Sequence, residues 1–184
     1  MKKSLLGLLV VSLVLTGASC GSDDKTTTKT AANTAAAVST VKVNEAAKAG
    51  DISHTVTLAE KMDTIPASKT VEDFKSIAKD KKAADGFTWV HLTGKVTNNS
   101  SESENVSSNS LTVVDDSGKE YDLATDVTIY VPDDKFPTYI DIQPTQTVEW
   151  EAYYLVPTTA KGLKLKVNDL QILSDNEALV DLGL

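Results

Sequence analysis

The sequence contains no arginine, so all 18 of its basic residues are lysines. Without a guanidinium group, the chain lacks the side chain that recognises carboxylates and phosphates bidentately. Acidic residues number 26, which gives a formal net charge of -8. Because nucleic-acid affinity comes largely from contacts between cationic side chains and phosphates, we expect no nucleic-acid partner.

Catalytic and metal-binding side chains are also scarce, because the chain has one cysteine and two histidines, His54 and His91. Zinc takes three or four ligands, mostly His or Cys, so a site here would need carboxylates as well. No Gly-x-Ser-x-Gly, phosphate-binding glycine loop or His-Glu-x-x-His motif occurs. We therefore expect no cofactor, no metal and no enzyme activity, with His54 at the margin of the core. A Ser-His-Asp site stays an open alternative.

The single cysteine, Cys20, follows a segment typical of a secretion signal. Two N-terminal lysines precede an apolar run over residues 5–15, which is too short to span a hydrocarbon core of about 30 Å. Small residues at 17–19 then lead to Cys20. This arrangement resembles the lipobox of bacterial lipoproteins, although Gly17 departs from its usual residue. The alternative is an ordinary secretory signal that leaves a free thiol.

The lipobox resemblance implies that residues 1–19 are a signal peptide and that Cys20 becomes a lipidated first residue carrying a diacylglycerol. Stable anchoring takes about two acyl chains, which that group provides. The expected partner of the N-terminus is thus the cell membrane, on its extracytoplasmic face. Removal of the signal takes two lysines and no acids, so the mature chain is more acidic still.

Residues 20–50 are expected to form a flexible tether behind the lipid. They are rich in Thr, Ala, Lys and Asn, lack aromatic residues, and so bury too little apolar area to offset the entropy of ordering. A short early strand over residues 39–43 is the alternative for the end of this segment. From Asp51 the composition changes, which indicates a folded domain over residues 51–184.

Alternation of apolar and polar residues over 52–58 predicts a half-buried strand. A helix is predicted over about 71–84, because Val71, Phe74 and Ile77 fall on one face and Thr70 is a suitable N-cap. Everything after Gly86 reads as short strands separated by turns, which is typical of a mainly β, antiparallel β-sandwich. The predicted strands cover residues 87–97, 110–115, 120–123, 127–131, 139–142, 147–156 and 163–167, with a final segment or pair at 170–182.

Three segments carry a family resemblance: Trp89 to Asn99, Leu111 to Tyr121 and Ile142 to Pro157. They match, in order, a strand ending in Asn-Asn-Ser, a strand with an Asp-x-x-Gly turn and Tyr, and a segment ending in Val-Pro. Together they resemble telokin-like, immunoglobulin-fold domains of unknown function in Gram-positive surface lipoproteins, to which the mycobacterial immunoprotective extracellular antigen is related. Thr145 departs from the usual glycine. The resemblance implies an immunoglobulin-like β-sandwich with one added helix and no established reaction.

Two acidic pairs, Asp115-Asp116 and Asp133-Asp134, lie in predicted turns, where aspartate bonds to its own backbone. Calcium, which takes oxygen ligands, is the alternative for them. Trp89 is expected either to point outward as an exposed aromatic or to lie under the predicted helix. A possible binding loop combines aromatic and acidic residues: Tyr130, Asp133, Asp134, Phe136 and Tyr139.

These observations favour a non-catalytic, lipid-anchored cell-surface protein whose β-sandwich binds a protein, an envelope polymer or an ion. The scarcity of histidine and cysteine is the reason to expect no catalysis, and the signal segment is the reason to expect a lipid anchor. A small envelope hydrolase and a calcium-binding module remain as alternatives.

Overall fold

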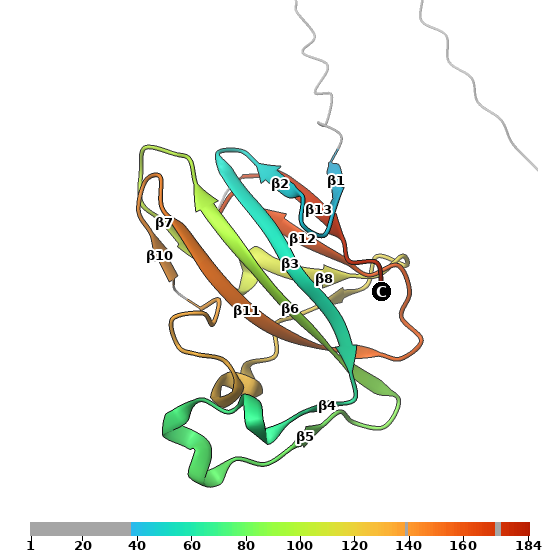
Figure 1. Cartoon of the computed structure of the whole chain (residues 1–184). Coiled ribbons are helices and arrows are strands. Elements are labelled where there is room, and N and C mark those ends of the chain that lie inside the picture. Colours follow the sequence, from blue (N-terminus) through green and yellow to red (C-terminus); the bar gives the residue numbers. More distant parts are fainter. Residues whose placement is uncertain (1–37, 139, 172–173) are drawn as a thin grey trace, which may run out of the picture. The chain divides into compact units, whose positions relative to one another are not determined.

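A computed structural model describes residues 38–138, 140–171 and 174–184 of the chain (Figure 1). Residues 36–184 form one compact unit. The signal, Cys20 and most of the predicted tether lie outside the described residues, as does Tyr139. None of the helices in the described part of the chain has the length and hydropathy needed to cross a membrane.

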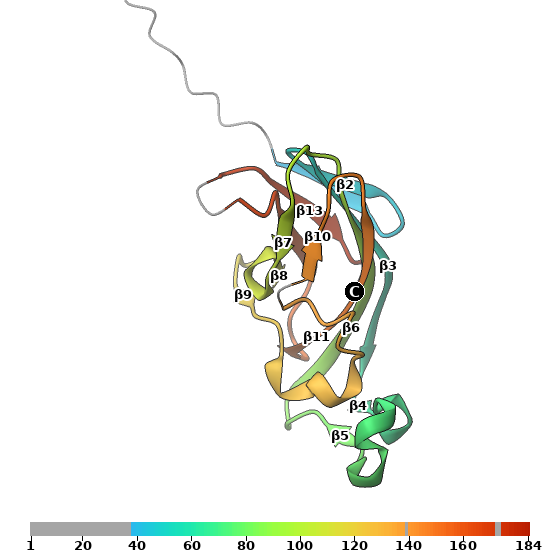
Figure 2. The same ribbon diagram turned by 90° about the vertical axis from the view of Figure 1, so that its left-hand side faces the viewer.

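Two sheets make up most of the unit, and Figure 2 shows them as separate layers. The five-stranded sheet has the order β1 (Ser39–Lys42), β13 (Glu177–Asp181), β12 (Lys164–Asn168), β8 (Leu111–Val114), β9 (Glu120–Tyr121). The four-stranded sheet has the order β11 (Thr147–Pro157), β6 (Phe87–Asn98), β3 (Ile52–Met62), β2 (Ala46–Ala49). All pairings are antiparallel except that of β1 with β13.

Smaller elements complete the unit. Two short ladders pair β7 (Glu104–Val106) with β10 (Ile140–Ile142) and β4 (Thr64–Ile65) with β5 (Lys81–Lys82). Four 3-10 helices lie in connections: η1 (Ala67–Lys69), η2 (Glu72–Ile77), η3 (Ser108–Ser110) and η4 (Thr125–Tyr130). The ladder of β4 and β5, with η1 and η2 between its strands, lies at the opposite end of the sandwich from β1 (Figure 1).

The core lies between the two sheets and is built from alternate residues of the long strands. On β11, Trp150 and Tyr154 point inward and are fully buried, and the Tyr154 hydroxyl donates a hydrogen bond to the Leu111 carbonyl at 3.0 Å. His54 is also fully buried, with its Nε2 2.9 Å from the Asn168 carbonyl oxygen. Its burial lowers the pKa of His54 to about 4, despite that backbone bond. The predicted place of His54 at the core margin is therefore wrong.

The mainly β, antiparallel sandwich predicted from the turns and alternation is confirmed, but three local predictions are corrected. Strands β1 and β2 lie inside the predicted tether, so the folded unit begins before Asp51. The predicted strand over 127–131 is the 3-10 helix η4. The predicted helix over 71–84 is reduced to the six-residue η2, which buries none of its residues.

The physical reason for the missing helix lies in its apolar face. Phe74 and Ile77 are 40% and 61% exposed, so the face that would have stabilised a longer helix has nothing to pack on. The segment is instead held at its base by polar contacts: the Val71 N–H donates to the Ile129 carbonyl and the Ala67 N–H to the Asp80 carboxylate.

Candidate functional site

The outward face of the four-stranded sheet carries a group of polar side chains from three neighbouring strands. Residues directly opposite one another in an antiparallel pair share a face. His91 on β6 lies opposite Glu60 on β3 and opposite Tyr153 on β11, and Thr93 lies opposite Glu151. These side chains therefore project together, away from the core.

A β-bulge in β3 creates this grouping. The register with β6 shifts between Val56 and Leu58, so one extra residue enters the strand at this point. Before the bulge, odd-numbered residues such as Thr55 face outward, and Thr57, at the bulge itself, contacts Thr93 on the same face. After it, Glu60 faces outward instead and meets His91.

His91 lies between two carboxylates from different strands. Its Nδ1 is 2.8 Å from Glu60 Oε1, and its Nε2 is 2.8 Å from Glu151 Oε1. The imidazole is only 1% exposed, although it belongs to the outward face. It stacks on the Tyr153 ring, with centroids 4.4 Å apart and planes 10° from parallel. Both ring nitrogens are thus used in contacts within the sheet.

Glu151 connects this histidine to its surroundings. Besides the His91 contact, its Oε1 accepts a hydrogen bond from the Tyr153 hydroxyl at 3.3 Å. Partial burial raises the pKa of Glu151, but the contact with His91 and the charge of Lys69 outweigh it and leave this pKa below the ordinary value. Burial, followed by the Glu151 charge, raises the pKa of the Tyr153 hydroxyl. Glu151 is therefore held as a carboxylate.

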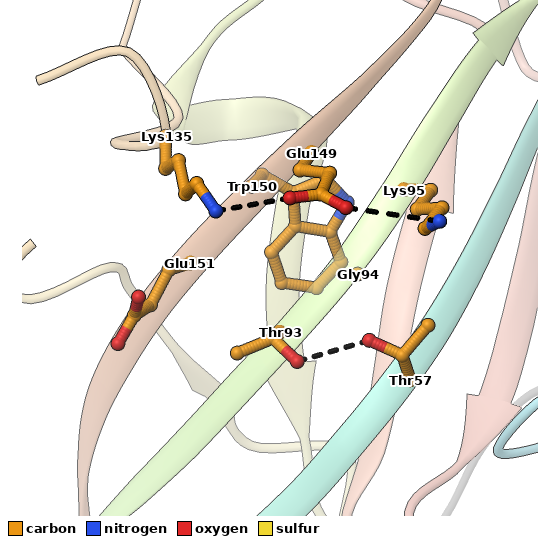
Figure 3. Close-up of a pocket in the computed structure, with 8 residues that line it drawn as sticks. All are labelled: Thr57, Thr93, Gly94, Lys95, Lys135, Glu149, Trp150 and Glu151. Atoms are coloured by element: carbon orange, nitrogen blue, oxygen red, sulfur yellow. Dashed lines mark hydrogen bonds and ion pairs between the residues drawn. The ribbon is translucent and has the colours of Figure 1, made fainter. Parts of the chain in front are cut away.

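A shallow hollow of about 180 Å³ begins at Glu151 and extends along β6 (Figure 3). Figure 3 shows Lys135, Glu149 and Lys95 in a row, linked by ion pairs of 2.9 and 3.7 Å. The hydroxyls of Thr57 and Thr93 lie 2.9 Å apart in the same view. The ammonium of Lys135 lowers the pKa of Glu149, and Glu149 in turn raises the pKa of Lys135. The lining is thus a mixture of hydroxyls and opposite charges.

The loop before β10 forms one wall of the hollow, because it is bonded to the edge of β11. The Glu151 N–H donates to the Lys135 carbonyl at 2.8 Å. Gly94 and Trp150 lie at the base, where the indole packs beneath the glycine on the core side of the sheet. The wall and the base are therefore both fixed by the sandwich.

A family model for a domain of unknown function (DUF4352) matches residues 41–178. The chain belongs to the DUF4352 family. The predicted resemblance to an immunoglobulin-like domain of unknown function is confirmed. No curated protein matches the chain.

Solved structures share the fold of this DUF4352 chain. The yjhA protein from Bacillus subtilis is 15% identical, with a TM-score of 0.53, covering 77% of this chain and 98% of its own. A conserved hypothetical protein from Bacillus anthracis is 16% identical, with a TM-score of 0.52, covering 76% and 94%. The secreted protein MPT63 from Mycobacterium tuberculosis is 10% identical, with a TM-score of 0.50, covering 78% and 97%. At these identities the likeness shows the fold alone.

The predicted binding loop of the DUF4352 chain lies beside the hollow, but the rings of Tyr130 and Phe136 are not available to a ligand. Tyr130 and Phe136 are buried, and the Tyr130 hydroxyl donates to the Lys79 carbonyl at 2.7 Å. Asp133 and Asp134 are exposed, and Tyr139 lies outside the described residues. This burial contradicts the prediction that the two rings capture a ligand, because the loop uses them to attach itself to the sandwich.

Trp89 is buried rather than exposed, and the predicted helix does not cover it. Its Nε1 donates to the Lys81 carbonyl of β5 at 3.2 Å, and the Lys81 ammonium lies 5.8 Å from the ring centroid. Strand β5 therefore covers Trp89, where the face of Phe74 and Ile77 on the predicted helix was expected.

The acidic pairs do not converge on a cation site. Asp115 accepts hydrogen bonds from the Ser117 and Tyr121 hydroxyls, which lower the pKa of its carboxyl to about 2, and it also bonds to nearby backbone N–H groups. This is the turn role of aspartate. In the part of the chain that the structure describes, no group of three His, Cys, Asp or Glu residues is arranged to hold a metal ion.

The hydrolase alternative required a serine, an acid and a histidine within hydrogen-bond reach. His91 contacts two acids through its two nitrogens, and His54 contacts a backbone carbonyl. Among the described residues, no serine hydroxyl is hydrogen-bonded to either imidazole. The DUF4352 domain therefore shows no nucleophile activated by a histidine in its described part.

Sequence reasoning missed Glu60, Glu151 and the hollow. The alternation of β6 did place Trp89 and His91 on one face, and the same alternation in β11 places Tyr153 and Glu151 together. The missing information is the register between strands and the bulge at Val56, neither of which the alternation encodes.

Proposed function

We propose that this DUF4352 protein is a lipid-anchored, extracytoplasmic binding module, and that the hollow on its four-stranded sheet recognises a hydroxyl-rich envelope polymer. The anchor rests on the lipobox-like residues that precede Cys20 and on the lipid that they imply. Binding without catalysis rests on the saturated contacts of His91, whose nitrogens are both occupied by carboxylates.

The side chains that line the hollow indicate which class of ligand it binds. Two threonine hydroxyls, two ammonium groups and two carboxylates surround it, and all of these are hydrogen-bonding groups. Protein interfaces instead depend on buried aromatic and aliphatic anchors. The one aromatic residue at the hollow, Trp150, is buried in the core. A polyhydroxylated chain satisfies such a surface better than a protein does.

A second argument comes from the sheet itself. Further hydroxyls continue along the same outward face, because Thr97 and Thr147 are opposite each other and their hydroxyls are 2.8 Å apart. An extended polymer can follow such a row of hydroxyls beyond the hollow. The affinity of each contact is modest, so binding is expected to depend on repetition along the polymer.

Co-sedimentation with purified cell-wall sacculi tests this function. The double variant Thr57→Val, Thr93→Val removes both hydroxyls from the hollow while it keeps the side-chain volume and strand preference. We expect it to lower the bound fraction at least fivefold. The control is Thr40→Val, which removes an exposed hydroxyl from β1 on the five-stranded sheet and is expected to retain the binding. Equal binding by the parent and the first variant contradicts the proposal.

A further inference from the structure

Each ring nitrogen of His91 faces a carboxylate oxygen at 2.8 Å. An imidazole donates from both nitrogens only when it carries two protons, because the neutral ring has one N–H and one lone pair. A neutral ring would therefore point a lone pair at an ionised carboxylate. This arrangement fits an imidazolium that bridges two strands across β6.

We propose that His91 is a proton-operated clasp, which ties Glu60 of β3 to Glu151 of β11 while it is doubly protonated and releases Glu60 when one proton leaves. The choice of bond follows from exposure. The side chain of Glu151 is 16% exposed and that of Glu60 is 45% exposed. Leaving the less exposed carboxylate unpaired costs more, so the remaining N–H stays with Glu151 and water solvates Glu60.

Charged groups from every neighbouring element act on this clasp. Glu60 belongs to β3, and Glu151 and Tyr153 belong to β11. Lys69 of η1 acts on Glu151 through its charge. Stacking on the Tyr153 ring favours the cationic form of His91, since a ring face attracts positive charge. The Lys69 ammonium favours the neutral form of His91 instead, because two cations next to Glu151 repel each other.

The clasp regulates the hollow, and this one step rests on the proposed function. Glu151 belongs to both, and Glu149 and Lys135 complete the nearby charges. Loss of the His91 proton removes one positive charge next to Glu151, so the net charge beside the hollow becomes more negative by one unit. Anionic ligands are then expected to bind less tightly at higher pH and cationic ligands more tightly, because rim charges of like sign repel.

Nitrogen-15 NMR of the imidazole rings tests the clasp without any ligand. The chain from Gly21 onward contains the whole compact unit and only two histidines, so each ring is assigned directly. We expect both His91 nitrogens to be protonated at the acidic end of the folded range and one to lose its proton as the pH rises. His54 serves as an internal reference, because its contact is with a backbone carbonyl.

Two matched variants separate the clasp from general electrostatics. Glu60→Gln keeps an acceptor oxygen but removes the charge, so we expect His91 to lose its second proton at a lower pH than in the parent. Glu149→Gln removes a carboxylate from the same sheet face that does not contact His91, and its effect should be much smaller. The amide spectrum of each variant shows whether it is folded.

Three results overturn the clasp: a single proton on His91 throughout the folded range, two protons throughout that range, or equal effects of Glu60→Gln and Glu149→Gln. Failure of the sacculi experiment leaves this measurement unaffected, because it uses no polymer. Conversely, if His91 titrates as expected and the hollow binds nothing, the clasp stands and its effect on the hollow is overturned.

Discussion

The indole of Trp150 packs against the backbone of Gly94, its opposite neighbour on β6: a Cβ placed on Gly94 would lie 2.4 Å from Cζ2 of that indole. Any side chain larger than hydrogen would have to displace the largest residue of the core. We expect Gly94→Ala to lower the free energy of unfolding by about 1–3 kcal/mol, as overpacking does. Urea unfolding followed by tryptophan fluorescence measures this change.

The control for that variant is a smaller ring at the contact. In a Trp150→Leu background, Gly94→Ala should cost less but still be destabilising, because the new methyl group meets no indole yet would lie 2.6 Å from the Thr55 carbonyl oxygen. The difference between the two backgrounds is the coupling energy of the pair. A cost that is the same in both backgrounds would show that Gly94 is needed for a reason other than Trp150.

The buried His54 makes stability depend on pH. Its folded pKa of about 4 lies below the unfolded value of 6.5, so the unfolded chain binds the proton first. Stability is therefore lost as the pH falls from about 6.5 towards 4, by roughly 2–3 kcal/mol for this group. In His54→Gln, whose amide can still donate to the Asn168 carbonyl, unfolding free energies at pH 7 and pH 4.5 should differ by that much less. Parallel losses in parent and variant contradict this prediction.

The exposed residues of η2 are expected to tolerate polar substitution. Phe74→Ser and Ile77→Ser should each change the free energy of unfolding by less than about 0.5 kcal/mol, because neither side chain is buried. A helix packed on Trp89 would instead predict a loss of about 3 kcal/mol for Phe74. Thermal unfolding of the two variants, compared with Trp89→Leu as the buried control, distinguishes these cases.

The lipid anchor predicts a simple labelling result. Cells that express the full chain with a fatty-acid analogue should incorporate the label, and Cys20→Ala should abolish incorporation because no other cysteine is present. The matched control is Ser22→Ala, which lies just beyond the lipidated position. An unlabelled parent chain would favour the ordinary secretory signal, and label retained by Cys20→Ala would show that the lipid is attached at another residue.

The long strands were predictable because their alternation is strong. Residues 87–97 and 147–156 became β6 and β11, each extended by one residue at its end. The apolar face of Phe74 and Ile77 predicted a helix that does not form. A 3.6-residue pattern indicates a helix only where other residues cover its apolar face, and here that face is exposed. Strand β1 corresponds to the early strand over residues 39–43 that the sequence offered as an alternative, whereas β2 was not predicted, because its short Ala-Lys sequence resembles a tether.

The candidate site was less predictable than the fold. His91 was visible in the sequence, but its partner Glu60 lies 31 residues away, on a strand whose face changes at a bulge. Glu151 lies 60 residues away on the other side. Such a cluster depends on the register of three strands, which local patterns do not specify. The prediction that Tyr130 and Phe136 bind a ligand failed for a related reason, because the sequence does not show which side of a loop is buried.

Amide chemical shifts during titration with soluble muropeptides released from cell-wall sacculi test most directly whether the outward face of the four-stranded sheet is the binding surface. The proposed function predicts saturable shifts at Thr93, Lys95 and Glu149, with little change at Lys166 on the five-stranded sheet. Shifts confined to the five-stranded sheet, or none at saturating muropeptide, would contradict it.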